Sequence, residues 1–258
     1  MNEDISSGPA VAAFAGCTIR ARSLPDFFLQ LTARLAEGAE GLIFAHHNLH
    51  SLYLVQTDEQ VRRFYQTSCE CYIDGIGALW ALRVAGVETA GMQRFSFMDC
   101  LPEFLTMAER ASLRVFYLGG SPASVEQARH WLGESWPELA IGLHHGYESN
   151  SERVIERINT FAPDLLLVGL GMPLQEQWIL EHRDALTAGI ILQAGGTLDY
   201  YSGEQAQPPA SWSRHGAAWL YRLLHDPGRL WRRYLLTPWF LLAPLLRLRL
   251  AVSKETPR

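Results

Sequence analysis

Polar side chains and glycines follow several short apolar runs, and these are the positions where the sequence could do chemistry. Asp74 closes the run CYID, and Gly75 and Gly77 leave space around its carboxylate. A carboxylate placed in this way can take a proton from an attacking hydroxyl group. The same position also suits the cap of a helix that begins at Gly75, and this window leaves both interpretations open. Asp199 is similarly ambiguous, because it could hold a substrate hydroxyl or tie the turn YYSG.

Three glycine-containing turns follow apolar runs and indicate a site for phosphate groups. Gly119 and Gly120 in FYLGGSP allow close backbone approach, and Pro122 opens a helix whose free N–H groups would attract a phosphate or diphosphate. Gly171 in VGLGMPLQEQW repeats that arrangement, and Gly196 lies in QAGGTLDYYSG. In an open parallel sheet, ligands bind beyond the carboxyl ends of the strands. The turns therefore favour a nucleotide crevice.

The motifs of other nucleotide-binding and metal sites are absent or weak. VGLGMPLQ has leucine where a dinucleotide fingerprint needs its third glycine, and the chain has no P-loop lysine motif. The pairs His46-His47 and His144-His145 cannot easily chelate one ion, because adjacent strand residues point to opposite faces. The chain also has no Asp-x-Asp. We expect no metal and no cofactor, so arginines and helix N-termini would meet the negative charge of a diphosphate.

The pattern of elements predicts an α/β fold with a parallel sheet flanked by helices. Short apolar runs alternate with longer amphipathic segments, as expected when buried strands are joined by crossover helices. The predicted strands are Leu42–Ala45, Cys71–Asp74, Arg114–Leu118, Ile141–His144, Asp164–Gly169 and Ile190–Ala194. The predicted helices lie near Glu59–Gln66, Ile76–Val84, Leu101–Ala111, Ser124–Leu132, Ser151–Phe161 and Gln175–Arg183.

Composition and length indicate a folded body with an appendage. The chain has 258 residues, of which 48% are hydrophobic and 19% charged, which excludes disorder for most of it. The formal net charge of −5 argues against general nucleic-acid binding. The four cysteines show no zinc-site spacing, and we expect reduced thiols. The linker-like EQAQPPAS after Gly203 predicts a body over residues 1–205 and an appendage over 206–258.

The appendage combines aromatic, basic and apolar residues in a way that suits the surface of a membrane. The run Leu235–Leu246 is too short and too broken by proline to span a bilayer, which needs about 20 residues. We therefore expect this part to lie on an anionic inner leaflet. Arg229, Arg232 and Arg233 would share one face of a straight helix, where they could meet lipid phosphates or a diphosphate. A solvated basic face and an oligomer contact remain alternatives.

Several motifs in order resemble the WecG/TagA/CpsF glycosyltransferase family. They are DGIGALWALRVAG, RVFYLGGSP, HHGY, PDLLLVGLGMPLQEQWI, GGTLDYYSG and WLYRLLHDPGRLWRRY, and they span about Asn48 to Tyr234. The resemblance implies a Rossmann-like catalytic body with a short helical C-terminal appendage that associates with the membrane. It also implies inverting transfer of a hexose from a UDP-sugar to a sugar carried on undecaprenyl diphosphate, in the synthesis of a cell-surface polysaccharide. The hexose could be N-acetylmannosamine, its uronic acid, glucose or a similar sugar.

The resemblance also implies roles for individual residues. Asp74 matches the catalytic base of the family. Substrate-binding roles are implied for Asn48, Arg94, Gln175 and Asp199 in the body, and for Arg222, Arg229 and Arg232 in the appendage. The chain departs from the family where His46 replaces a threonine and Phe97 replaces a glycine, and at Gln207 and Ala218.

The implied partners are the UDP-sugar, the polyprenyl-diphosphate-linked acceptor and the inner leaflet of the cytoplasmic membrane, with no nucleic acid. We accordingly expect a cytoplasmic protein that is peripheral on the inner face of the cell membrane, and a homo-oligomer is possible. Two other classes stay open from the sequence. They are a nicotinamide-dependent Rossmann oxidoreductase and a non-catalytic, membrane-associated nucleotide-binding scaffold.

Overall fold

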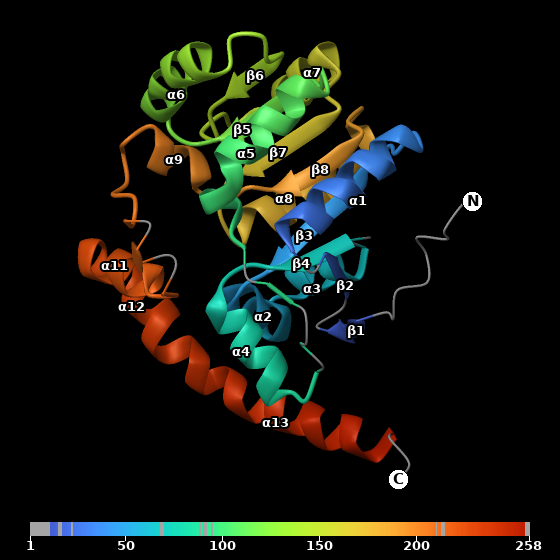
Figure 1. The fold of residues 1–258 in the computed structure, drawn as a ribbon, viewed down its shortest axis with the longest axis vertical. Coiled ribbons are helices and arrows are strands. Elements are labelled where there is room, and N and C mark those ends of the chain that lie inside the picture. The colour runs from blue at the N-terminus through green and yellow to red at the C-terminus, as the bar shows by residue number, and fades with distance from the viewer. Residues whose placement is uncertain are drawn as a thin grey trace.

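The chain folds around one central sheet with helices packed on both faces (Figure 1). The structure is a computed structural model, and it describes residues 11–14, 17–21, 23–67, 70–87, 89, 92–93, 95–209, 211–212 and 215–255. The described strands are β1 (Val11–Phe14), β2 (Cys17–Ala21), β3 (Leu42–His47), β4 (Glu70–Ile73), β5 (Val115–Gly119), β6 (Ile141–His144), β7 (Leu165–Gly169) and β8 (Ile190–Gln193).

The sheet order is β1-β2-β4-β3-β8-β7-β5-β6. Every pair from β2 to β6 is parallel, and only β1 runs antiparallel to its neighbour among the described strands. The six predicted strands correspond to β3 through β8, so the prediction of an α/β fold with a parallel sheet is confirmed. Strands β1 and β2 extend the sheet at one edge and were not predicted from the sequence.

Helices cover both faces because side chains alternate along buried strands. Leu165 and Leu167 of β7 pack with α1 (Leu24–Ala36), α5 (Phe97–Arg110) and α6 (Pro122–Ser135). Leu166 and Val168 belong to the core on the opposite face. That core includes α2 (Leu49–Thr57), α3 (Glu59–Thr67), α4 (Ile76–Val84), α7 (Ser151–Phe161) and α8 (Leu174–His182).

The last part of the chain runs along the edge of the molecule as a string of helices (Figure 1). The short helices η2 (Arg183–Ala185) and α9 (Thr197–Tyr201) precede it. It consists of α11 (Ala218–His225), α12 (Pro227–Trp231), the π-helical turn η3 (Arg232–Leu236) and α13 (Thr237–Glu255). Leu241 and Leu245 of α13 are buried in the core that contains α2 and α4. None of the described helices has the length and hydropathy needed to cross a membrane.

The cysteines differ from the expectation of reduced thiols. Cys71 of β4 is in a disulfide bond, so the expectation is wrong at this position, whereas Cys100 of α5 is free and buried. No group of three or more His, Cys, Asp or Glu side chains in the described part of the chain is arranged to hold a metal ion.

Candidate functional site

The predicted site residues meet at the carboxyl ends of the central strands. A cavity of about 260 Å³ is lined by residues that follow β3, β4, β7 and β8, together with residues of α11 and η3. From β3 the chain continues to β4, which lies on one side of β3. It later returns through β7 to β8, which lies on the other side of β3. Ligands of open α/β sheets bind at such a change of direction. The cavity wall includes the predicted residues Asn48, Asp74, Gly171, Gln175, Gly196, Asp199 and Arg222.

Asp74 extends the end of β4 and presents its carboxylate to the cavity. Its backbone N–H donates to the carbonyl of His47 over 2.9 Å, which continues the pairing of β4 with β3. Gly75 follows with φ +86°, a conformation that favours glycine, and α4 begins without a side-chain cap. The Asp74 carboxylate therefore does not cap this helix, which removes one of the two interpretations open from the sequence. About a quarter of the side chain, 23%, is exposed.

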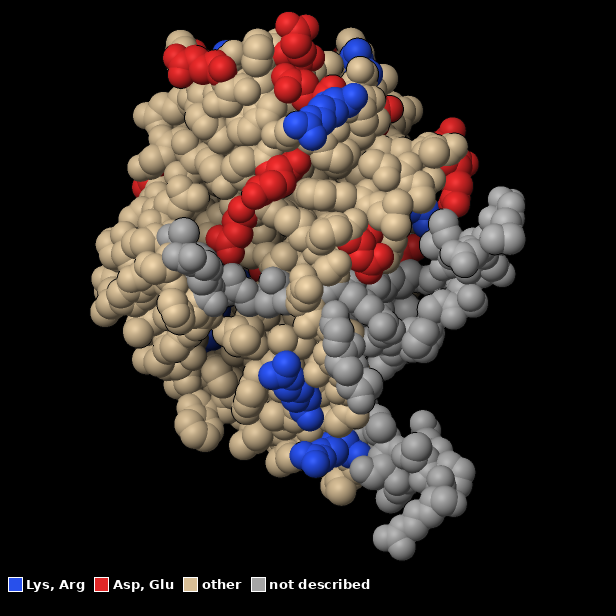
Figure 2. Space-filling view, viewed as in Figure 1, with Lys and Arg blue, Asp and Glu red and all other residues tan. Residues whose placement is uncertain are grey.

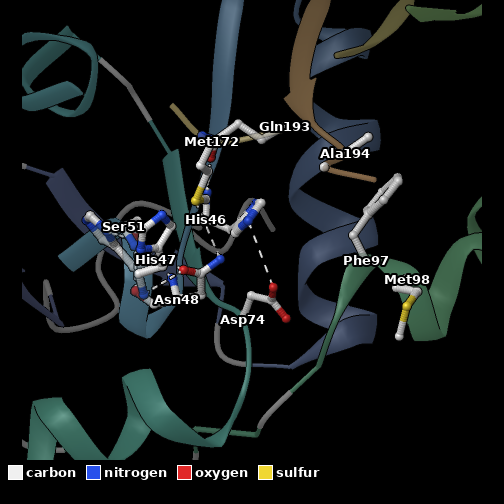
Figure 3. A network of polar contacts seen from close by, with 12 residues as sticks. His46, His47, Asn48, Ser51, Asp74, Phe97, Met98, Met172, Gln193 and Ala194 are labelled. Carbon is white, nitrogen blue, oxygen red and sulfur yellow. Dashed lines mark hydrogen bonds and ion pairs between the residues drawn. The ribbon is translucent and has the colours of Figure 1, made fainter. Parts of the chain in front are cut away.

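His46 lies beside Asp74 at the end of β3 (Figure 3). Its Nε2 is 3.9 Å from Oδ2 of Asp74. Its backbone is held on both sides, because its N–H donates to Oε1 of Gln193 and its carbonyl accepts from the hydroxyl of Tyr65, each over 2.7 Å. Burial lowers the pKa of His46, which keeps the imidazole neutral at pH 7. A neutral ring can direct an N–H toward the carboxylate without neutralising it.

Asn48 is fixed by the helix that it begins. Its Oδ1 accepts from the backbone N–H groups of His50 and Ser51 over 2.9 and 3.0 Å, and Ser51 completes the capping box. Its Nδ2 lies 3.6 Å from Sδ of Met172, on the cavity side (Figure 3). The amide oxygen is thus used by α2, while the amide nitrogen remains available to donate to a ligand.

Gln175 belongs to a buried polar network that supports the glycine turn after β8. Its Oε1 accepts from the N–H of Gly195 over 3.1 Å, and its Nε2 donates to Oε1 of Glu176 over 3.0 Å. Gln193 donates to the same carboxylate oxygen. Burial raises the pKa of Glu176 to about 7. Glu176 and Gln193 were not predicted from the sequence, although Gln193 directly follows the apolar run Ile190–Leu192 and Glu176 is next to the predicted Gln175.

Asp199 lines the cavity and also connects α9 to Ser124 of α6 and to Gln205 beyond the turn YYSG. Its Oδ1 accepts from the hydroxyl of Ser124 over 3.0 Å, and its Oδ2 accepts from Nε2 of Gln205 over 3.2 Å. Both interpretations from the sequence are therefore compatible with its position. Its carboxylate is held in place before any substrate binds.

Gly119 and Gly120 do not lie on the wall of this cavity, unlike Gly171 and Gly196. At Gly119 a Cβ atom would come within 2.4 Å of the carbonyl oxygen of Gly169, so this glycine permits close strand packing. The N-terminus of α6 is capped by the hydroxyl of Ser121, which also donates to the carboxylate of Glu204. The structure thus places the first glycine turn behind the cavity.

The appendage arginines separate into different surroundings. Arg222 is half-buried, with its guanidinium 5.2 Å from the centre of the Tyr200 ring, and its buried Nε has no hydrogen-bond partner in the described part of the chain. Arg232 is exposed and lies over the ring of Trp231 at 5.3 Å, away from the cavity. Arg94 and the side chain of Arg229 lie outside the described residues. Arg233, which received no role from the resemblance, lines the cavity in place of Arg232.

A second cavity of about 280 Å³ adjoins the first. The two share Asn48, Asp74, Ser96, Arg222, Arg233 and Tyr234. Ile76, Trp219 and Pro238 give the second cavity an apolar side. Asp74 and two arginines therefore lie on a wall common to two neighbouring cavities, which allows two ligands to meet at one carboxylate.

Comparison of this chain with known proteins identifies its family. The model of the "Glycosyl transferase WecG/TagA/CpsF family" matches residues 12–255. Relatives from Staphylococcus aureus strains MW2, NCTC 8325 / PS 47 and MRSA252 are each 28% identical over 201 residues, which cover 73% of this chain and 78% of the relative. Each is named N-acetylglucosaminyldiphosphoundecaprenol N-acetyl-beta-D-mannosaminyltransferase. The match extends over nearly the whole chain, and the protein therefore belongs to the WecG/TagA/CpsF family of glycosyltransferases.

Proposed function

We propose that this protein transfers a hexose from a UDP-sugar to a sugar carried on a polyprenyl diphosphate, with inversion at the anomeric carbon. The observation that carries the proposal is the position of Asp74 on the wall shared by two cavities. A transferase that acts in one displacement needs a base between its donor and its acceptor. The names of the relatives supply the lipid-linked acceptor and N-acetylmannosamine as the first candidate for the transferred sugar.

The two cavities differ in the chemistry of their walls. The first contains the glycine turns after β7 and β8 with Asn48, Gln175 and Asp199, which suit the polar groups of a nucleotide sugar. The second adds Ile76, Trp219 and Pro238 to the shared arginines, which suits a diphosphate attached to a hydrocarbon chain. We assign the donor to the first cavity and the acceptor to the second.

In the proposed reaction, Asp74 accepts the proton of the acceptor hydroxyl as its oxygen attacks the anomeric carbon of the donor. The new C1–O bond forms on the face opposite the departing UDP, whose C1–O bond breaks with both electrons going to the diphosphate. His46 lies beside the Asp74 carboxylate, and Arg222 faces the growing negative charge. These groups account for the proton and the charge, so the proposed step uses no cofactor.

The appendage brings the acceptor cavity to a membrane in this proposal. One side of α13 exposes Trp239, Leu242, Leu246 and Leu250, a set that we call the outer stripe. Arg247 and Arg249 lie next to it and are also exposed. In Figure 2, basic side chains lie over the lower part of the face, where Figure 1 places α4 and α13, and the upper part carries both acidic and basic side chains. We propose a catalytic body over residues 1–205 and an appendage over 206–258 that attaches to the inner leaflet.

Replacement of the base tests the proposal directly. Asp74→Asn should lower kcat by about 10²- to 10⁴-fold, because the amide cannot accept the proton, while the affinity for UDP stays unchanged in calorimetry. The assay uses a panel of UDP-sugars with a synthetic polyprenyl-diphosphate monosaccharide, and NMR of the product reports inversion or retention. Asp184→Asn is the matched control, because that carboxylate is 95% exposed on η2. Near-normal turnover of Asp74→Asn would reject this base, and UDP binding without any transfer by the wild type would favour the scaffold.

A further inference from the structure

His46 lies on the donor side of Asp74. It lines the first cavity and not the second, whereas Asp74 lines both. Its Nε2 is 3.9 Å from Oδ2 of Asp74 (Figure 3). In an inverting displacement, the base and the attacking hydroxyl lie on one face of the donor sugar, and the leaving group departs from the opposite face. A side chain beside the base therefore meets the sugar and not the departing diphosphate.

The imidazole of His46 is fixed before any ligand binds. The residue is only 5% exposed, and its backbone is held by Gln193 on one side and by Tyr65 on the other. Its ring lies against Tyr72, with the ring centres 5.5 Å apart. A side chain that is already ordered loses little conformational entropy on binding, which favours a role in recognition.

One nitrogen of this ring indicates where its proton lies. Nδ1 is buried and makes no hydrogen bond to any described residue. A buried N–H without an acceptor is more costly than a bare ring nitrogen, so the proton of the neutral imidazole belongs on Nε2. Burial lowers the pKa of the ring, which keeps it neutral at pH 7. Nε2–H is therefore an uncharged donor at the wall of the first cavity.

The next histidine in the chain shows the contrasting, structural arrangement. Nδ1 of His47 is 3.1 Å from Oγ of Ser51, and its ring stacks on Tyr65 with the centres 4.0 Å apart. His47 lines neither cavity, because neighbouring side chains of β3 point to opposite faces. The Nε2 of His46 is too far from Asp74 for a hydrogen bond, so this N–H can be given to an oxygen of a ligand.

We propose that His46 binds the transferred hexose, with Nε2–H donating to an oxygen of the sugar near the anomeric carbon. The proposal rests on the proposed function and deepens it, because it names a residue that determines which sugar is transferred. Uncharged side chains share the first cavity with His46 (Figure 3), and they are Asn48, Phe97, Met98 and Met172. A site that hydrogen-bonds a substrate hydroxyl discriminates against analogues in which that hydroxyl is absent.

Calorimetry with and without the sugar tests this assignment. The probes are UDP, UDP-N-acetylmannosamine and UDP-glucose. His46→Phe keeps a ring without a donor, and His46→Gln keeps an N–H donor. His46→Phe should weaken the binding of whichever UDP-sugar the wild type binds more tightly by about tenfold, as expected for a lost hydrogen bond. The affinity for UDP should stay unchanged, because UDP has no hexose. His46→Gln should keep part of the affinity for the UDP-sugar.

Two other histidines supply matched controls. His130→Phe changes an imidazole that is 78% exposed on α6, and His50→Phe changes one that lines the second cavity and not the first. Neither variant should alter the affinity for the UDP-sugar. Thermal unfolding reports whether each variant is folded, and His46→Leu takes the place of His46→Phe if the larger ring prevents folding.

The comparison of UDP with the UDP-sugar separates the possible outcomes. Equal losses for both ligands in the folded His46 variant, or no loss for either, would overturn the inference. A lower kcat at unchanged affinity for the UDP-sugar would also overturn it, because His46 would then act only through Asp74. Failure of the proposed function would instead appear as absent transfer by the wild type from every UDP-sugar of the panel.

Discussion

At the scale of single residues, Glu176 shows how buried polar groups support the site. It holds Gln175 and Gln193 through one carboxylate oxygen, and these two glutamines fix the turn at Gly195 and the backbone of His46. Its carboxyl group is fully buried, which explains the pKa of about 7. Glu176 and Gln193 therefore position groups around Asp74 from behind, while Gln175 also lines the cavity.

The raised pKa of Glu176 makes the stability of the protein depend on pH. Between about pH 4.5 and 7 the folded chain keeps a proton that the unfolded chain releases, so the free energy of unfolding falls as the pH rises through this range. The loss above pH 7 is on the order of 3 kcal/mol. Glu176→Gln removes the titration and keeps an oxygen that accepts from both glutamines. The free energy of unfolding of this variant, relative to that of the wild type, should therefore rise from pH 5 to 7.5.

Urea denaturation at several pH values measures this difference. Glu181→Gln is a suitable control, because its side chain on the same helix is 74% exposed. Parallel pH profiles for the wild type and Glu176→Gln would contradict the prediction.

Some of these residues could be predicted from the sequence, and others could not. Asp74 was predicted because it ends an apolar run before a glycine, and the structure places it on the cavity wall. Glu176 and Gln193, and the position of His46 beside Asp74, became visible only when strand pairing brought β3 beside β8 and α8. Spacing along a chain reports neighbours within one element and does not report contacts across a sheet.

At the scale of elements, apolar runs located β3, β4, β5, β7 and β8 because these strands are buried on both faces, and they also located the partly buried edge strand β6. Strand β1 is only the four-residue apolar run VAAF, the sequence CTIRA of β2 mixes polar and apolar residues, and α2 has apolar residues on several sides. None of these three elements was predicted. Arg229, Arg232 and Arg233 were placed on one helical face by assuming a straight α-helix. The π-helical turn η3 breaks that assumption, and it has no signature in the sequence.

The helix α13 has an inner and an outer side, and the contribution of the outer stripe to membrane binding can be tested. Leu241 and Leu245 pack into the core, while Trp239 is 74% exposed and Leu246 is 45% exposed. Trp239→Ala combined with Leu246→Ala should weaken binding to anionic vesicles by about tenfold or more, because less apolar surface enters the membrane interface. Cosedimentation measures the partition, and the melting temperature should stay close to that of the wild type.

A control on the opposite face of the sheet separates this effect from general loss of hydrophobicity. Leu29→Ala changes an exposed leucine of α1 and should leave vesicle binding as it is. Equal vesicle binding by the double variant and the wild type would show that the outer stripe does not contact the membrane.

At the scale of the whole molecule, one continuous segment connects the membrane contact to the chemistry. Arg222 and Tyr234, which line both cavities, lie on α11 and η3, and α13 follows directly after η3. The part of the chain proposed to rest on lipid is thus also a wall of the acceptor cavity. Any displacement of α13 from the body would also disturb the place where the two substrates meet.

This continuity has a kinetic consequence, because an attached enzyme searches for its lipid substrate in two dimensions. The rate should follow the mole fraction of acceptor within the bilayer and not its amount per volume of solution. Adding carrier lipid to the same vesicles, at constant total acceptor and enzyme, should therefore slow the reaction in proportion to the dilution. A rate that does not change when carrier lipid is added would mean that the enzyme binds its acceptor from bulk water.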